Sequence, residues 1–273
     1  MMRLGPLGGL REIVTFPEVP VAAERASSSW TTLGGRVVTQ RAPRRTRSWS
    51  LDFERIPPAD IAYLSALASG ALPGPTYLYT EVAAQTNLLP ADVAAPGQMG
   101  VSGLLPPGGV GVARGTVQAL MGGALAGLVG VSCDPSLPGE WTATLPLPLG
   151  AYRLSGWATS AGSVLIWRTV NLDGDQVATG TVTAASSSGS FRGEAAVTLS
   201  GAAVGLQVRL PANADPFRRV GAFRLTAGST AQGLDWIGGE GVPEVVVDDP
   251  SQTLQLVTAG RIAADYSVTI RGV

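Results

Sequence analysis

The chain has 273 residues, of which 45% are hydrophobic and 14% charged, with 36 glycines and 20 prolines. This composition is typical of short strands joined by turns, and the length predicts about two domains. The formal net charge is −1, so the chain lacks the overall basic charge of nucleic-acid-binding proteins and we expect no specific nucleic-acid binding. The absence of histidine and the single cysteine, Cys133, exclude a Ser-His-Asp triad, a histidine-bound zinc and an intrachain disulfide.

No segment predicts membrane insertion or secretion by the standard route. Residues 1–19 carry only a short apolar stretch interrupted by Pro6, followed by charges at Arg11 and Glu12. The longest apolar run, 117–133, contains four glycines and a glutamine, and it is shorter than the ~20 residues that a membrane span needs. Because the chain has no histidine, no pair of cysteines and no glycine-rich phosphate-binding loop ahead of a predicted helix, we expect no catalytic residue, metal or cofactor in it.

The stretch 36–56, RVVTQRAPRRTRSWSLDFERI, predicts a strand, a turn and a second strand. Ala42 and Pro43 interrupt the first strand, and four arginines surround this break. The second strand alternates between apolar and polar residues, so one of its faces carries Trp49, Leu51 and Phe53.

A helix is predicted next, in 57–70. Pro57 and Pro58 suit a helix start, and Asp60 complements its positive end. Its apolar stripe consists of Ile61, Leu64, Leu67 and Ala68. Gly70 marks its end, and 76–82 predicts another short strand.

The middle of the chain predicts a β-sandwich of the jelly-roll type. Its candidate strands follow each other at intervals of ~8–14 residues, the spacing expected for such a fold. They are 140–145, 152–159, 163–172, 176–183, 191–199, 204–210 and 220–226. Asp173 and Asp175 lie between two of them in NLDGDQ, which lacks the ligand spacing of an EF-hand and is interpreted as a turn.

The last block, 229–273, again predicts strands, in PEVVVDD and ADYSVTIRGV. Residues 1–86 carry a net charge of +2 and residues 229–273 a net charge of −4. These opposite charges favour packing of the two blocks together. The predicted fold is therefore mainly β: a sandwich or barrel domain formed by 1–86 with 229–273 and one short helix, with a jelly-roll sandwich, 87–228, inserted in it.

Three segments at the chain ends resemble a known family: RSWSLDFE (47–54), DWIGGEGVPEVVVDD (235–249) and DYSVTIRGV (265–273). Together with the order of elements they are similar to minor tail proteins of long-tailed bacteriophages, more specifically to the distal tail protein class. The resemblance implies a structural virion protein at the tail tip, made in the host cytoplasm, that assembles into a ring of six identical subunits. It implies contacts with the tail tube protein and with tip, hub or tape-measure proteins, and no catalytic role.

In the middle block, NLLP (87–90), GAYRLSGWATSAG (150–162) and RRVGAFRLTAG (218–228) resemble the jelly rolls of carbohydrate-binding modules. That resemblance implies an alternative function, adhesion to a host cell-wall glycan. Outward-facing aromatic residues could then stack on sugar rings, and the candidates are Trp167, Trp141 and Tyr152. The alternation in 163–170 predicts Val164, Ile166 and Val170 on one face of a strand and Leu165 and Trp167 on the other, which either binds sugar or is covered by another part of the chain.

The arginine cluster has three interpretations. Contact with DNA in the tail channel is disfavoured, since affinity for a moving polyanion would slow its passage. The cluster could be the solvated tip of a hairpin, or it could form a contact between subunits in which guanidinium groups meet carboxylates. The candidate contact residues are Arg41, Arg44, Arg45 and Arg47 on one side and Asp248 and Asp249 on the other.

Overall fold

The structure is a computed structural model. It describes residues 2–13, 21–24, 27–41, 46–54, 57–96, 112–116, 129–133, 139–187, 190–212, 218–228, 236, 238–239, 241–257 and 261–273. The chain forms two compact units. The end unit comprises Met1–Pro6, Arg11–Leu78 and Pro243–Val273, and the inserted unit comprises Leu7–Leu10 and Tyr79–Val242. The predicted fold class is confirmed: the protein is mainly β, with one sheet built from both chain ends beside a short helix and an inserted antiparallel, sandwich-like sheet.

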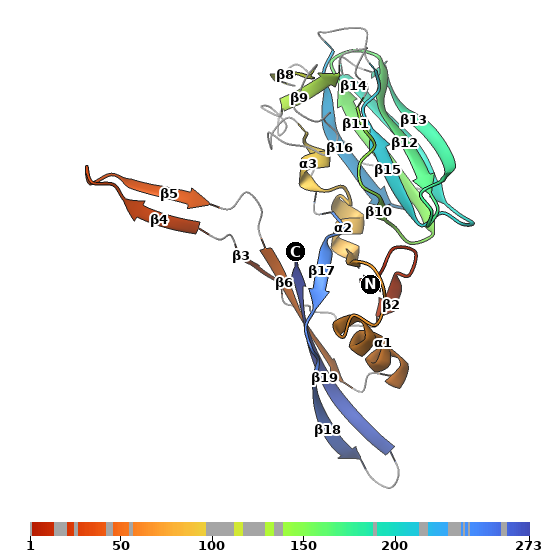
Figure 1. Cartoon of the computed structure of the whole chain (residues 1–273). Coiled ribbons are helices and arrows are strands. Elements are labelled where there is room, and N and C mark those ends of the chain that lie inside the picture. Colours follow the sequence, from red (N-terminus) through yellow and green to blue (C-terminus); the bar gives the residue numbers. More distant parts are fainter. Residues whose placement is uncertain are drawn as a thin grey trace. The chain divides into compact units, whose positions relative to one another are not determined.

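The end unit is built around a sheet with strand order β2-β1-β7-β17-β19-β6-β3, and β18 pairs with β19 off this path. In that order the strands are β2 Arg11–Ile13, β1 Met2–Gly5, β7 Thr76–Thr80, β17 Glu244–Val247, β19 Arg261–Gly272, β6 Thr46–Glu54 and β3 Val21–Glu24, and β18 is Ser251–Val257. β6 and β19, drawn in orange-brown and blue in Figure 1, come from opposite ends of the chain and lie side by side.

The pairing of β6 with β19 explains the alternating strand in the sequence. The apolar residues predicted on one face of β6, Trp49, Leu51 and Phe53, are all buried. They lie opposite three apolar residues of β19 that are buried as well, namely Ile270, Val268 and Tyr266. Two strands more than 200 positions apart in sequence thus share one apolar face, and burial of this face stabilises their register.

Helix α1, Pro58–Ala68, covers this core with Leu64 and Leu67, which belong to the same buried cluster. Pro58 lies in the first turn, where its missing N–H costs nothing. The helix ends as predicted at Gly70, whose positive φ of 69° suits glycine, and Ala71 N donates to Ala66 O at 2.9 Å.

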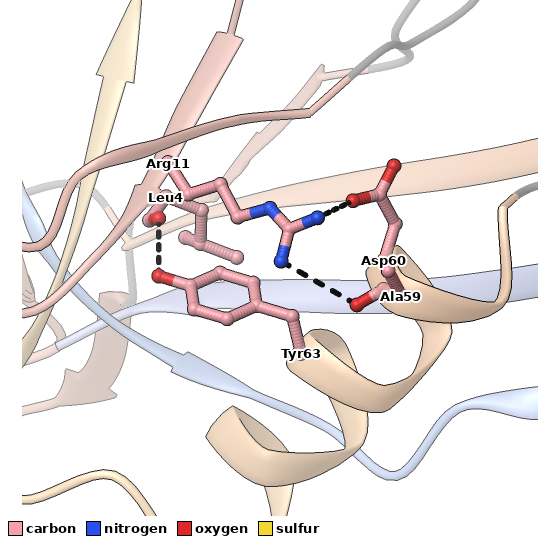
Figure 2. Close-up of polar contacts among 5 residues, drawn as sticks. All are labelled: Leu4, Arg11, Ala59, Asp60 and Tyr63. Atoms are coloured by element: carbon pink, nitrogen blue, oxygen red, sulfur yellow. Dashed lines mark hydrogen bonds and ion pairs between the residues drawn. The ribbon is translucent and has the colours of Figure 1, made fainter.

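The start of α1 is attached to the β1–β2 strands by the polar contacts drawn in Figure 2. The Arg11 guanidinium forms an ion pair with Asp60 and lies over the Tyr63 ring, 5.1 Å from its centroid. Tyr63 Oη donates to Leu4 O at 2.9 Å. Asp60 therefore has a partner besides the helix dipole that the sequence predicted for it.

Strands β4 Ser27–Thr31 and β5 Val37–Arg41 form a separate two-stranded sheet, seen in Figure 1 as a ribbon of its own. The predicted hairpin between β5 and β6 is wrong, because β5 pairs with β4, and β6 pairs with β3 and β19. The reason lies in the preceding turn: Gly35 has a φ of 78°, and Thr32 N donates to Arg36 O at 2.8 Å. Gly34-Gly35 thus closes the hairpin ahead of β5.

The inserted unit has a nine-stranded sheet in the order β10-β15-β12-β13-β14-β11-β16-β9-β8. These strands are β10 Leu145–Pro146, β15 Gly205–Arg209, β12 Gly162–Val170, β13 Gln176–Ser187, β14 Ser190–Leu199, β11 Gly150–Ala158, β16 Val220–Ala227, β9 Val129–Cys133 and β8 Val112–Thr116. Two short helices, α2 Glu81–Thr86 and α3 Ala91–Ala94, precede them. The predicted strand 76–82 therefore ends at Thr80, the N-cap of α2.

Glycines in the inserted unit make room for aromatic side chains. A Cβ atom at Gly156 of β11 would lie 2.6 Å from Phe223 Cδ1 and 2.8 Å from Val164 Cγ1. Since β13 and β14 separate β11 from β12 in the sheet order, the approach of Gly156 to Val164 crosses the interior of the curled sheet. At Gly180 of β13 a Cβ atom would lie 2.5 Å from the Trp167 indole, which explains the need for glycine there.

Candidate functional site

The β4–β5 hairpin, which we call the arm (residues 27–41), exposes apolar side chains. Trp30 keeps 48% of its surface accessible and lies opposite Val38 across the hairpin. Val37 and Leu33 are exposed as well. A two-stranded hairpin by itself is only marginally stable in water, and exposed apolar side chains on it are costly unless a partner covers them. The arm is therefore a candidate surface for contact with another protein.

Of the four arginines predicted as contact residues, the structure describes the backbone of two. Arg41 is the last residue of β5, and Arg47 is the second residue of β6, with a half-buried side chain. Arg44 and Arg45 lie outside the described residues, as does the side chain of Arg41. The arginines therefore occupy the connection from the arm to β6 and are not the tip of a β5–β6 hairpin.

The predicted acidic partners follow β17. Asp248 accepts hydrogen bonds from Arg271 of β19, with 3.1 Å between Arg271 Nε and Asp248 Oδ1, and Arg271 Nη2 bonds the same oxygen. This hydrogen bond and the charge of Asp248 raise the pKa of Arg271. Asp249 is exposed. Asp248 therefore already has a cation within its own unit, whereas Asp249 presents its side chain to solvent.

Two of the three aromatic residues predicted to stack on sugars are buried in the inserted unit. Trp167 is 9% exposed, and Tyr152 is 3% exposed with its Oη donating to Pro148 O at 2.6 Å. Trp167 faces inward together with Leu165, and Ile166 is half-buried on the other face. The predicted grouping of Val164 with Ile166 is wrong, because a bulge between β12 and β13 inserts Val164 as an extra residue that is buried next to Leu165.

The third aromatic residue, Trp141, lies in a cluster of cations that the sequence did not predict. The guanidinium carbons of Arg168 and Arg209 lie over its ring, at 4.4 and 4.5 Å from the centroid. Arg168 Nε donates to Gln207 Oε1 at 2.7 Å, and Gln207 Nε2 donates to Thr144 Oγ1 at 2.9 Å. All five side chains are half-buried. The sequence signals this cluster only by placing Arg168 and Arg209 at outward positions of two predicted strands. That these two positions are neighbours follows from the register between the strands, which the sequence does not give.

Asn87, the first residue of NLLP, is completely buried and holds this segment against β16. Its amide nitrogen donates to Phe223 O at 2.9 Å, and its Oδ1 accepts from Leu89 N at 3.1 Å and from Leu225 N at 3.0 Å. These three bonds leave little of the amide unsatisfied, so Asn87 has a structural role in the inserted unit.

Within the part of the chain that the structure describes, no group of three or more acidic or cysteine residues could hold a metal ion. Asp173 and Asp175 lie in a tight turn, in which Asn171 Oδ1 accepts from Asp175 N at 2.8 Å and Gly174 N donates to Asn171 O at 3.1 Å. This turn agrees with the interpretation of NLDGDQ from sequence. None of the described helices is long and apolar enough to span a membrane.

Comparisons of the chain with protein-family models, with curated proteins and with solved structures gave no match.

Proposed function

We propose that this chain is a structural protein of a bacteriophage tail tip, in which identical subunits form a ring, expected to be hexameric, between the tail tube and the tip or hub proteins. Two of the three segments that carry the family resemblance, 47–54 and 265–273, belong to β6 and β19. Their pairing and shared apolar face support treating the two segments as parts of one architectural element of the end unit.

The arm is the observation that carries the proposal. It pairs with no other strand among the described residues, and it exposes Trp30 and Val37. In a ring, each arm would bind the next subunit and bury these side chains. A head-to-tail contact of this kind closes on itself after a fixed number of subunits.

One edge of the sheet in the end unit supports the same arrangement. β3 ends the strand order on one side, and its Val21 is 55% exposed. An exposed apolar edge strand is prone to pair with other chains, and a defined neighbour removes that risk. A subunit contact at the arm and at β3 would cover apolar surface at both places.

Negative-stain electron microscopy of the purified full chain tests the proposal. The expected particles are closed rings of one diameter with a central channel. Single particles of the size of one chain at every concentration would contradict it, and open filaments would show that the contact is head-to-tail but does not close.

The arginines in the sequence between β5 and β6 provide a second test. Replacing Arg44 and Arg45 by glutamate is expected to leave a folded subunit that no longer assembles, since the reversed charges would repel carboxylates of the neighbouring subunit. Assembly of that variant into normal rings would remove the arginines from the subunit contact while leaving the arm contact untouched.

The alternative of a glycan-binding adhesin rests on Trp141 alone among the three aromatic candidates, because Trp167 and Tyr152 are buried. Guanidinium groups lie over the Trp141 ring where a neutral sugar would stack. We therefore favour the structural function.

A further inference from the structure

The cluster around Trp141 combines two cations from neighbouring strands of the inserted unit. In the antiparallel pair β12–β15, Arg209 lies opposite Ile166 and Arg168 lies opposite Gln207. Residues two positions apart in a strand share a face, so both arginines lie on the same face of the sheet. Trp141 comes from the segment ahead of β10, where Thr142 N donates to Val208 O at 2.9 Å. The register of three segments thus brings both guanidinium groups to one indole.

Neither arginine forms an ion pair with a carboxylate among the described residues. Arg168 is oriented by the chain of side-chain bonds through Gln207 to Thr144. The guanidinium of Arg209 has no hydrogen-bond acceptor in the described part of the chain, and its Nε is buried. The indole contacts the Arg209 guanidinium, so an added ligand with acceptor oxygens would meet donors that no described residue uses.

Two other arginines of the same sheet are paired with a carboxylate and serve as a comparison. On β14, Glu194 pairs with Arg192, with 3.0 Å between Glu194 Oε2 and Arg192 Nη1, and with Arg153 of β11 at 3.8 Å. There a carboxylate lies between two cations. At Trp141 the corresponding anion is missing from the described residues, and two like charges remain close together.

The distances fit a group with several acceptor oxygens. Each guanidinium carbon lies within 4.5 Å of the Trp141 ring centroid, so the two carbons are at most about 9 Å apart. At this separation salt only partly screens the repulsion between the two positive charges. A tetrahedral oxyanion can accept charge-assisted hydrogen bonds of about 2.7–2.9 Å from two guanidinium groups at once. One guanidinium fork already occupies both oxygens of a carboxylate, whereas a phosphate has oxygens left for a second.

We propose that Arg168, Arg209 and Trp141 form a binding site for a phosphate group, with Gln207 positioning Arg168. The phosphate can be a free ion or part of a polymer of the cell surface, since the site recognises the same chemistry in both. The proposal does not depend on ring formation, because all of its residues belong to the inserted unit.

Calorimetric titration of the full chain with inorganic phosphate, at constant ionic strength kept with chloride, tests the site. We expect saturable binding that Arg209→Gln weakens on the order of tenfold or more, the loss that follows from removing a hydrogen bond to a charged group. Arg168→Lys keeps the charge but loses the fork, and it should weaken binding as well. Arg153→Gln, which removes a cation of the same unit that already has a carboxylate partner, is the matched control and should bind as the unchanged protein does.

A second arm of the experiment separates the two sources of phosphate. Poly(glycerol phosphate) that binds more tightly than inorganic phosphate, per phosphate group, would identify a polymer ligand, and equal binding would identify the free ion. Binding of either ligand supports the proposed site only if Arg209→Gln lowers the affinity for that ligand. Circular dichroism of each variant confirms that it is folded; if Arg209→Gln fails this check, Arg168→Lys carries the test.

Three outcomes would overturn the proposal. These are binding of phosphate no tighter than that of chloride, a loss of affinity in Arg153→Gln equal to that in Arg209→Gln, and displacement of phosphate by neutral dextran. The last result would make Trp141 part of a neutral-sugar site. None of the three would affect the ring proposal, which is tested on particle shape.

Discussion

The two units of this chain differ in where their large apolar side chains lie. In the inserted unit, glycines at 156 and 180 let Phe223 and Trp167 fill the interior, although single apolar side chains such as Leu172 remain exposed. The end unit has a core of its own at β6 and β19, but its arm leaves Trp30 and Val37 exposed. This difference is the basis of our proposal that the end unit, through its arm, contacts a neighbouring subunit.

The largest expected effect concerns the arm. Replacing both Trp30 and Val37 by serine should raise the dissociation constant of the assembly by about a thousandfold or more, since two central apolar contacts contribute about 2 kcal/mol or more each to an interface. The free energy of unfolding of the subunit should change by less than about 0.5 kcal/mol, because both side chains are exposed. Sedimentation velocity measures the first quantity and urea denaturation the second.

The matched control for the arm is the double variant Leu149→Ser and Leu172→Ser in the inserted unit, where these side chains are 62% and 66% exposed. It removes a similar amount of exposed apolar surface, and assembly should be unchanged. Equal loss of assembly in both variants would abolish the contrast between the two units.

The next effect concerns the core of the inserted unit. Phe223 is completely buried, and Phe223→Ala should lower the free energy of unfolding by about 3–5 kcal/mol through lost burial and a cavity next to Gly156. Val177→Ala, at a side chain that is 45% exposed, should be nearly neutral. Denaturation followed by tryptophan fluorescence compares the two, and a loss below about 1 kcal/mol for Phe223→Ala would contradict the described packing.

A smaller effect is expected at Asn87. Asn87→Ala removes one donor and one acceptor that satisfy three buried backbone groups, and it should cost about 3 kcal/mol. Gln85→Ala removes only an exposed bond to Glu81 and should cost less than about 0.5 kcal/mol. Thermal unfolding of the two variants measures the difference, and equal melting temperatures would show that Asn87 does not hold the segment.

The smallest effect is a dependence of stability on alkaline pH. Burial raises the pKa of Tyr63 above its ordinary value, and the charge of Arg11 partly offsets this. Because the folded pKa is the higher one, the stabilisation is present below the unfolded pKa of about 10 and is lost as pH rises through the folded pKa. Tyr63→Phe should therefore lose less stability between pH 9.5 and 11 than the unchanged protein, and parallel curves would contradict the assignment.

Local patterns in the sequence predicted much of the fold, because they report which side of a strand or helix is buried. The alternation at Trp49, Leu51 and Phe53 and the end of α1 at Gly70 are such cases. The partner of a strand depends on competing turns, and the sequence favoured the break at Pro43 over the glycine turn at Gly35. The pairing of β5 was therefore missed.

The candidate sites were less predictable for a related reason. A single bulged residue, Val164, changed which side chains of β12 face inward, and period-two alternation carries no signal for a bulge. The cluster at Trp141 depends on the register between β12 and β15, which brings together residues about 40 positions apart. Such a contact cannot be read from one stretch of sequence.

The mass of the purified chain in solution tests the central claim, assembly of the end units into a ring, most directly. Light scattering coupled to size-exclusion chromatography should give a species of about six times the subunit mass of 27.8 kDa, and the Trp30 and Val37 double variant should elute as a single folded subunit. A mass of 27.8 kDa for the unchanged protein at all concentrations would contradict the account.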